Sequence, residues 1–234
     1  MKERDFMTPE RANVITITRQ LGSGGTSLGQ RVARQLGYAY ADRQILKLAA
    51  EKLEVDIEDL TYRDEQVQSY WDRLFQIFSV GTPECPYTPP PLRVVSDEQL
   101  LATEQRIIKD LAGRGCCVII GHGAFHLLKG QAGVLNVFVH AAMDFRVARV
   151  MKLYRMSSRD EARQVIERAD REREKYIRIT SGCNWFDARN YHLTMDFERI
   201  GFEDAERLIE SIAIPSGAGA PLSDPAALLE DTEP

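Results

Sequence analysis

The sequence predicts an α/β protein with a parallel β-sheet that is covered by helices on both faces, in three layers. Short apolar runs rich in β-forming residues alternate with stretches whose apolar residues recur at helical spacing. This alternation is typical of strand–helix–strand units. At 234 residues the chain can bury one substantial core. We therefore expect a single domain over residues 12–213.

Five apolar runs are the expected strands, and helical patterns fall between them. The strands are expected at 14–18, 38–41, 117–121, 135–139 and 193–196. A helix with Leu28, Val32 and Leu36 on one face follows the first strand, and another with Leu100, Ile107, Ile108 and Leu111 precedes the third. Two more helices are expected at 143–153 and 203–212, after the fourth and fifth strands.

Three segments do not fit this alternation. Residues 52–96, rich in aromatics, are too long for an ordinary loop, and we interpret them as an insert that covers a substrate. This insert could equally pack on the sheet or bind another subunit, which would make a homodimer. Residues 154–190 are the second such segment and are rich in arginine. Residues 214–234 hold few apolar groups, so we expect a flexible tail.

Charge and cysteine content exclude several classes of function. The formal net charge of −5 argues against a protein that coats a nucleic-acid polymer, which needs an excess of Lys and Arg. The four cysteines have neither zinc-site spacing nor a disulfide framework. No apolar stretch is long enough to span a bilayer, and the polar start lacks the core of a signal peptide. We expect a cytoplasmic protein with no membrane partner.

A glycine-rich segment between the first strand and the first helix is the candidate phosphate loop. It reads Arg19-Gln20-Leu21-Gly22-Ser23-Gly24-Gly25-Thr26-Ser27. A strand, a glycine turn and a helix start direct backbone N–H groups and the positive helix end at one anion. Because a tight turn without a ligand would have the same glycines, the strand and helix on either side carry the prediction of phosphate binding.

This loop lacks the lysine of a standard Walker A sequence. Compared without gaps with the Gly-x-x-Gly-x-Gly-Lys-Gly-Thr loop of nucleoside monophosphate kinases, it has Gly25 at the lysine position. Ser27 then stands at the hydroxyl position that contacts Mg²⁺. Arg19, at the end of the first strand, is our hypothesis for the replacement cation. A surface arginine or a structural ion pair is the alternative.

Several segments, in the same order, resemble the cytidylate-kinase-like family. They are 17–25, 36–46, 118–124, 138–149, 170–176 and 185–193. The resemblance implies the P-loop kinase fold with strand order 2-3-1-4-5, a helical substrate insert and an arginine-rich lid at 154–190. It also implies transfer of the γ-phosphoryl group of ATP, with Mg²⁺, to a nucleoside monophosphate such as CMP or dCMP. Three residues depart from the pattern: His122 replaces an arginine, and Gly123 and His192 each replace an aspartate.

The loop residues Gly22, Ser23, Gly24, Gly25, Thr26 and Ser27 are expected to hold the nucleotide phosphates. Between residues 146 and 178, nine arginines and two lysines face six acidic residues, a local excess of five positive charges. Most of these cations fit exposed i,i+4 ion pairs. Arg171 and Arg173 are the expected catalytic pair beside Arg19, with Arg173 favoured because it fits Asp-x-x-Arg-x-x-Tyr.

On the acceptor side we expect substrate contacts from Asp42, Arg43, Lys47 and His122, and Arg146 is expected to reach the adenine or phosphate side. For Asp42 the alternative is a helix cap, and for His122 a hydrogen-bonded core histidine. The partners in either case are small-molecule nucleotides. The sequence leaves two functions open, an active kinase and a catalytically impaired nucleotide-binding or sensing protein.

Overall fold

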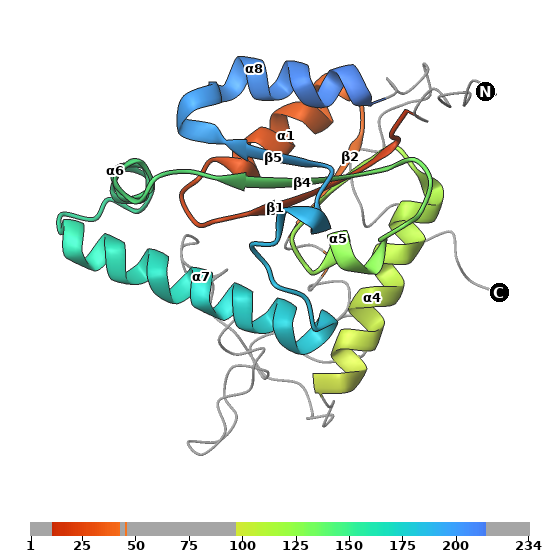
Figure 1. The fold of residues 1–234 in the computed structure, drawn as a ribbon, viewed down its shortest axis with the longest axis horizontal. Coiled ribbons are helices and arrows are strands. Elements are labelled where there is room, and N and C mark those ends of the chain that lie inside the picture. Colours follow the sequence, from red (N-terminus) through yellow and green to blue (C-terminus); the bar gives the residue numbers. More distant parts are fainter. Residues whose placement is uncertain (1–10, 43–44, 46–96, 214–234) are drawn as a thin grey trace, which may run out of the picture.

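The computed structural model describes residues 11–42, 45 and 97–213. Within these ranges five parallel strands form one sheet (Figure 1). The strands are β1 (Val14–Arg19), β2 (Ala39–Ala41), β3 (Cys117–Ile120), β4 (Val134–His140) and β5 (Leu193–Asp196). Their order is β2-β3-β1-β4-β5, which confirms the predicted topology. The carboxyl ends of β1 and β3, which are hydrogen-bonded neighbours, lie side by side.

Helices cover both faces of the sheet. The described helices are α1 (Gly25–Leu36), α4 (Asp97–Arg114), α5 (Ala124–Leu127), α6 (Met143–Tyr154), α7 (Arg159–Ser181) and α8 (Phe197–Ile212). Helices α1 and α8 pack on one face, and α4, α5 and α7 pack on the other (Figure 1). The structure therefore has the three layers that the alternating sequence predicts.

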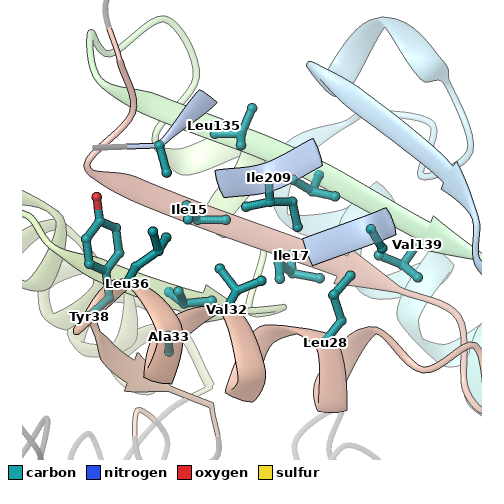
Figure 2. Packing of buried hydrophobic residues seen from close by; sticks show 14 of the residues in the cluster. Ile15, Ile17, Leu28, Val32, Ala33, Leu36, Tyr38, Leu135, Val139 and Ile209 are labelled. Atoms are coloured by element: carbon teal, nitrogen blue, oxygen red, sulfur yellow. The ribbon is translucent and has the colours of Figure 1, made fainter. Parts of the chain in front are cut away.

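Strand β1 runs through the centre of the core. All six of its residues are buried, as expected for a central strand of a parallel sheet. Ile15 and Ile17 point toward α1 and α8, where they pack with the α1 residues Leu28 and Val32 (Figure 2). Gly29 of α1 lies so close to the sheet that a Cβ there would be 2.4 Å from Ile120 Cδ1. This packing fixes the first turn of α1 against the end of β1.

The elements differ from the expected ranges at several ends. Strand β1 includes Arg19, and β3 ends at Ile120, so the three residues after it form a separate loop. Helix α8 begins at Phe197, before the expected start at 203, with a break in helical geometry at Gly201. Most of the expected lid is one helix, the 23-residue α7.

The predicted insert at 52–96 and tail at 214–234 lie outside the described residues, as do Arg43 and Lys47. In the described part of the chain, no helix is long and apolar enough to cross a membrane.

Candidate active site: a phosphate loop and two adjoining cavities

The segment after β1 has the geometry of an anion-binding loop. Gly22 and Gly24 adopt left-handed conformations, with φ of 81° and 100°. A Cβ on Gly24 would lie 2.5 Å from the Phe197 ring, and one on Gly22 would lie 2.8 Å from the carbonyl oxygen of Arg146. Both positions therefore need glycine. The N-cap of α1 is Gly24, which has no side chain to accept from the first N–H groups of the helix.

A cavity of about 220 Å³ opens beside this loop. Its lining residues are Arg19, Gln20, Leu21, Gly22, Gly24, Gly25, Thr26, Ser27, Asp42, Arg149, Leu153, Tyr154 and Arg173. We call it the loop cavity. Ser23 does not line it, because its side chain is buried and its Oγ donates to the carbonyl of Gln20 at 2.9 Å. The other five predicted loop residues all reach the cavity.

Arg19 extends from the end of β1 across the end of β3. Its side chain is almost buried, with the residue 7% exposed. The guanidinium donates from Nε to Thr26 Oγ1 at 3.3 Å and from Nη2 to Asp42 Oδ1 at 3.4 Å. A Cβ on Gly121 would lie only 2.3 Å from Nη1. Arg19 is therefore both a cavity cation and a member of a structural ion pair.

Gly25, at the position of the missing lysine, makes room for Arg19. A Cβ on Gly25 would lie 2.6 Å from the Cβ of Arg19 and 3.2 Å from that of Val139. A lysine at 25 and the observed Arg19 side chain cannot occupy this space together. Arg19 thus enters, from the strand, the space beside the glycine that stands at the lysine position.

A second, smaller cavity of about 30 Å³ adjoins the first. Its lining residues are Thr18, Arg19, Gly121, His122, Gly123, Arg173, Tyr176, Ile177 and Trp185. We call it the β3-side cavity, because three of these residues directly follow β3. Two residues, Arg19 and Arg173, line both cavities. Their guanidinium groups therefore stand at the junction between the two spaces.

Arg173 enters the junction from α7 and is 9% exposed. Its Nη1 lies 3.5 Å from Asp170 Oδ1, while its buried Nε has no hydrogen-bond partner among the described residues. Burial, and then the charge of Arg19, lower the pKa of Arg173 to about 10. The group stays positively charged near pH 7. Two cations held this close favour an anion between them.

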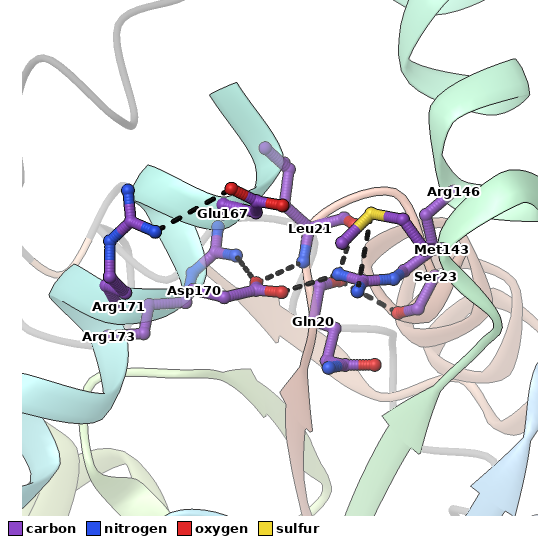
Figure 3. Close-up of polar contacts among 9 residues, drawn as sticks. All are labelled: Gln20, Leu21, Ser23, Met143, Arg146, Glu167, Asp170, Arg171 and Arg173. Atoms are coloured by element: carbon purple, nitrogen blue, oxygen red, sulfur yellow. Dashed lines mark hydrogen bonds and ion pairs between the residues drawn. The ribbon is translucent and has the colours of Figure 1, made fainter. Parts of the chain in front are cut away.

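Arg146 lies behind the loop and lines neither cavity. Its Nη1 donates to Asp170 Oδ2 at 2.5 Å and to the carbonyl of Leu21 at 3.5 Å, and Asp170 Oδ1 accepts from the backbone N–H of Leu21 at 2.9 Å (Figure 3). Asp170 thus joins α6, α7 and the phosphate loop. Arg146, expected to contact substrate, is placed as an anchor of the loop.

Arg171 lies on the solvent side of α7, away from both cavities. Its side chain is 67% exposed and its Nη1 lies 3.8 Å from Glu167 Oε2 (Figure 3). Residues two apart on a helix point in different directions, so Arg171 cannot share the position of Arg173. The structure therefore does not bring Arg171 together with the other expected catalytic residues.

A buried hydrogen-bond network backs the β3-side cavity. The Nδ1 atom of His122 lies 2.5 Å from Oε1 of Glu104, a residue of α4. The hydroxyl of Tyr176 donates to Glu104 Oε2 at 3.2 Å. Burial, and then the Glu104 charge, raise the pKa of Tyr176 well above its usual value, so the hydroxyl keeps its proton. His122 is thus a hydrogen-bonded side chain that also lines a cavity.

Sequence reasoning missed two residues of this site. Arg149 lines the loop cavity and lies over the rings of Phe145 and Phe202 at 5.8 and 5.7 Å. Burial lowers its pKa, and its buried Nε has no partner among the described residues. The burial of Glu104 could have been predicted from the sequence, because the residue stands on the apolar face of α4, one turn before Ile107 and Ile108.

Oxygen ligands for a metal are present in the loop cavity, at Ser27 and Asp42. Among the described residues, no group of three or more His, Cys, Asp or Glu side chains could hold a metal ion by itself. Mg²⁺ in phosphate sites is commonly held by one or two protein oxygens together with the phosphates. The donor set therefore fits an Mg²⁺ that is carried in with a nucleotide.

The sheet order and the glycine loop together define a P-loop protein of the kinase type. The model of the cytidylate kinase-like family matches residues 14–199. The chain therefore belongs to the cytidylate kinase-like family, as the resemblance of its motifs predicted.

One solved structure with a TM-score above 0.5 supports the fold, and two kinases are more distantly similar. An uncharacterized protein from Eubacterium ventriosum is 17% identical with a TM-score of 0.59, over 85% of this chain and 94% of that chain. A shikimate kinase from Bacteroides thetaiotaomicron is 15% identical with a TM-score of 0.48, over 85% and 96%. A gluconokinase from Sinorhizobium meliloti is 15% identical with a TM-score of 0.46, over 88% and 95%. No curated protein matches the sequence.

Proposed function

We propose that the protein transfers the γ-phosphoryl group of ATP to a nucleoside monophosphate, with a CMP-like or dCMP-like acceptor. One observation carries this proposal: Arg19 and Arg173 line both the loop cavity and the β3-side cavity. A group that passes from a donor in one space to an acceptor in the other meets both cations. Phosphoryl transfer depends chiefly on positioning and charge neutralisation, which two fixed guanidiniums supply.

The loop cavity suits the donor. The open N-terminus of α1 and the glycine turn supply N–H groups for phosphate oxygens. The buried Nε atoms of Arg149 and Arg173, without partners among the described residues, supply further donors. Ser27 and Asp42 would hold Mg²⁺, which would neutralise charge on the phosphates. Together these groups would neutralise the charge of a triphosphate in the absence of the usual lysine.

In the proposed reaction an anionic oxygen of the acceptor phosphate attacks the γ-phosphorus of ATP. The bond from that phosphorus to the β,γ-bridging oxygen breaks, and ADP leaves with the electron pair. Because the attacking oxygen is already deprotonated, no protein base is required. Arg19, set between the loop and Asp42, and Arg173, fixed by Asp170, would stabilise the negative charge during the transfer.

A panel assay tests the proposal. Purified protein is incubated with Mg²⁺-ATP and, separately, CMP, dCMP, UMP, AMP and GMP, and the nucleoside diphosphate product is measured. We expect product with CMP or dCMP. ATP binding without transfer to any acceptor would reject the kinase and favour the nucleotide-binding or sensing protein, the alternative that Gly25 at the lysine position suggests.

Arg19→Ala in the same assay tests the replacement cation. Removing one transition-state donor typically costs about 10²- to 10³-fold in rate, so we expect that loss in kcat with a much smaller loss in ATP affinity. Arg207→Ala, which alters an exposed arginine on α8, is the matched control. Unchanged transfer by Arg19→Ala would remove Arg19 from the mechanism.

A further inference from the structure

Glu104 is the most deeply buried carboxylate at the site, and the reaction proposed above does not use it. It is 1% exposed and projects from α4 behind the wall of the β3-side cavity. Each of its oxygens has a defined partner, Nδ1 of His122 at 2.5 Å and the hydroxyl of Tyr176 at 3.2 Å. A carboxylate in such a place is stable only with partners of this kind.

Both partners of Glu104 line the β3-side cavity, although Glu104 itself does not. The contact between Nδ1 of His122 and Oε1 of Glu104 fixes the orientation of the imidazole ring. The Tyr176 hydroxyl also lies 3.4 Å from the carbonyl oxygen of His122, so the phenol is held toward this loop. Glu104 thus sets the positions of two groups that a ligand in the cavity would meet.

The backbone at His122 has an unusual conformation for a residue other than glycine. Its φ is 54°, and the flanking Gly121 and Gly123 have φ values of 78° and 68°. Three successive left-handed residues give a sharp loop directly after β3, and a non-glycine residue in that region is strained. Such strain persists where surrounding contacts hold it, and here the Glu104 and Tyr176 contacts do so.

We infer that Glu104 is a positioning residue for acceptor specificity, acting through His122. The inference rests on the proposed function, in which Arg19 and Arg173 contact the transferring phosphoryl group at the cavity junction. The remainder of the acceptor then lies toward His122 and Trp185, which line the same cavity. The oriented imidazole is the polar group that distinguishes one base from another there.

The experiment compares the affinities of CMP, dCMP, UMP, AMP and GMP for the wild type and for Glu104→Gln. Isothermal titration gives each Kd, and the transfer assay gives each kcat/KM. Replacing the charged partner of His122 weakens one charge-assisted hydrogen bond, so we expect the ratio between the preferred and the next nucleotide to fall by about tenfold. The KM for ATP and the urea midpoint should stay close to those of the wild type. Asp110→Asn, the same acid-to-amide change on α4, is the control.

His122→Asn separates positioning from a general effect on stability. If Glu104 acts through His122, this variant loses the same selectivity, and the double variant loses no more than either single one. Additive losses, or a selectivity ratio unchanged in Glu104→Gln, would overturn the inference. If Glu104→Gln fails to fold, His122→Asn alone decides, because unchanged selectivity in that variant also overturns it.

The outcomes separate this inference from the proposed function. A wild type that binds the monophosphates selectively but transfers no phosphoryl group rejects the kinase, and the Kd ratios still decide the role of Glu104. A wild type that transfers the group, with the ratio unaltered in Glu104→Gln, rejects the inference alone. A wild type that binds none of the five nucleotides overturns both.

Discussion

The loop cavity and the β3-side cavity meet at two arginines but are built in different ways. Most of the loop cavity comes from one continuous stretch, residues 19–27, between β1 and α1. The β3-side cavity takes its wall from the end of β3, from α7 and from Trp185, with α4 behind it. Local backbone conformation forms the first, and hydrogen bonds between distant segments form the second.

This difference indicates where each cavity is sensitive. Around the loop, the close packing requires glycine at Gly22, Gly24 and Gly25, where a Cβ would collide with a neighbour. Around the β3-side cavity, the side chains present matter, since Glu104 serves two partners at once. The loop is sensitive at its glycines and at its anchors Asp170 and Arg146, whereas the network at the β3-side cavity depends on every hydrogen-bonded member.

Helix α7 joins the two regions through one face. Asp170, Arg173 and Tyr176 follow each other at intervals of three residues and therefore lie along the same side of the helix. Asp170 contacts the phosphate loop, Tyr176 contacts Glu104, and Arg173 between them lines both cavities. In the proposed reaction, the placement of this helix relative to the loop would set the distance between donor and acceptor.

The largest loss of activity among the substitutions that compare the two cavities is expected on this face of α7. Arg173→Ala removes a cation from the junction, and we expect kcat to fall about 10²-fold because a fixed donor to the transferring group is lost. Arg171→Ala, on the exposed side of the same helix, should keep kcat within about twofold. Steady-state transfer kinetics measure both. Similar losses in the two variants would show that the helix as a whole matters, and not the junction.

A smaller effect is expected from Gly25→Ala, which adds a methyl group where Arg19 passes. A Cβ there would lie 2.6 Å from Arg19 Cβ, and overpacking of this kind typically costs about 1–3 kcal/mol of unfolding free energy. We expect urea unfolding to show that loss, with transfer reduced as Arg19 is displaced.

Gly113→Ala is the matched control for Gly25→Ala. Gly113 is also a helical glycine, but a Cβ there would meet nothing within 4 Å. Alanine should leave stability unchanged or raise it by up to about 1 kcal/mol. If both substitutions change the unfolding free energy equally, the close contact at Gly25 does not affect stability.

The donor side was largely predictable from the sequence, because its signals are local. A strand, a glycine turn and an amphipathic helix stand in one run of residues, so the loop could be predicted from them, while the strand order came from the family resemblance. The placement of Arg146 could not, since it depends on the direction in which α6 packs. A helical wheel drawn from Asp170 and Tyr176 would have separated Arg171 from Arg173.

The acceptor side was harder because its parts lie far apart in the chain. Glu104 and His122 are 18 residues apart, and Glu104 and Tyr176 are 72 apart. Only the presence of an acid on the apolar face of α4 hinted at a buried partner. Arg149 gave no such hint, since an arginine on an amphipathic helix is ordinarily a solvent-exposed residue.

The most direct test of the account is a double-variant cycle on Arg19 and Arg173, measured as the single-turnover rate of phosphoryl transfer. If both guanidiniums act on the same transferring group, the double variant should lose much less than the product of the two single losses. Losses that multiply would contradict the account, because they would mean that the two arginines act at separate places.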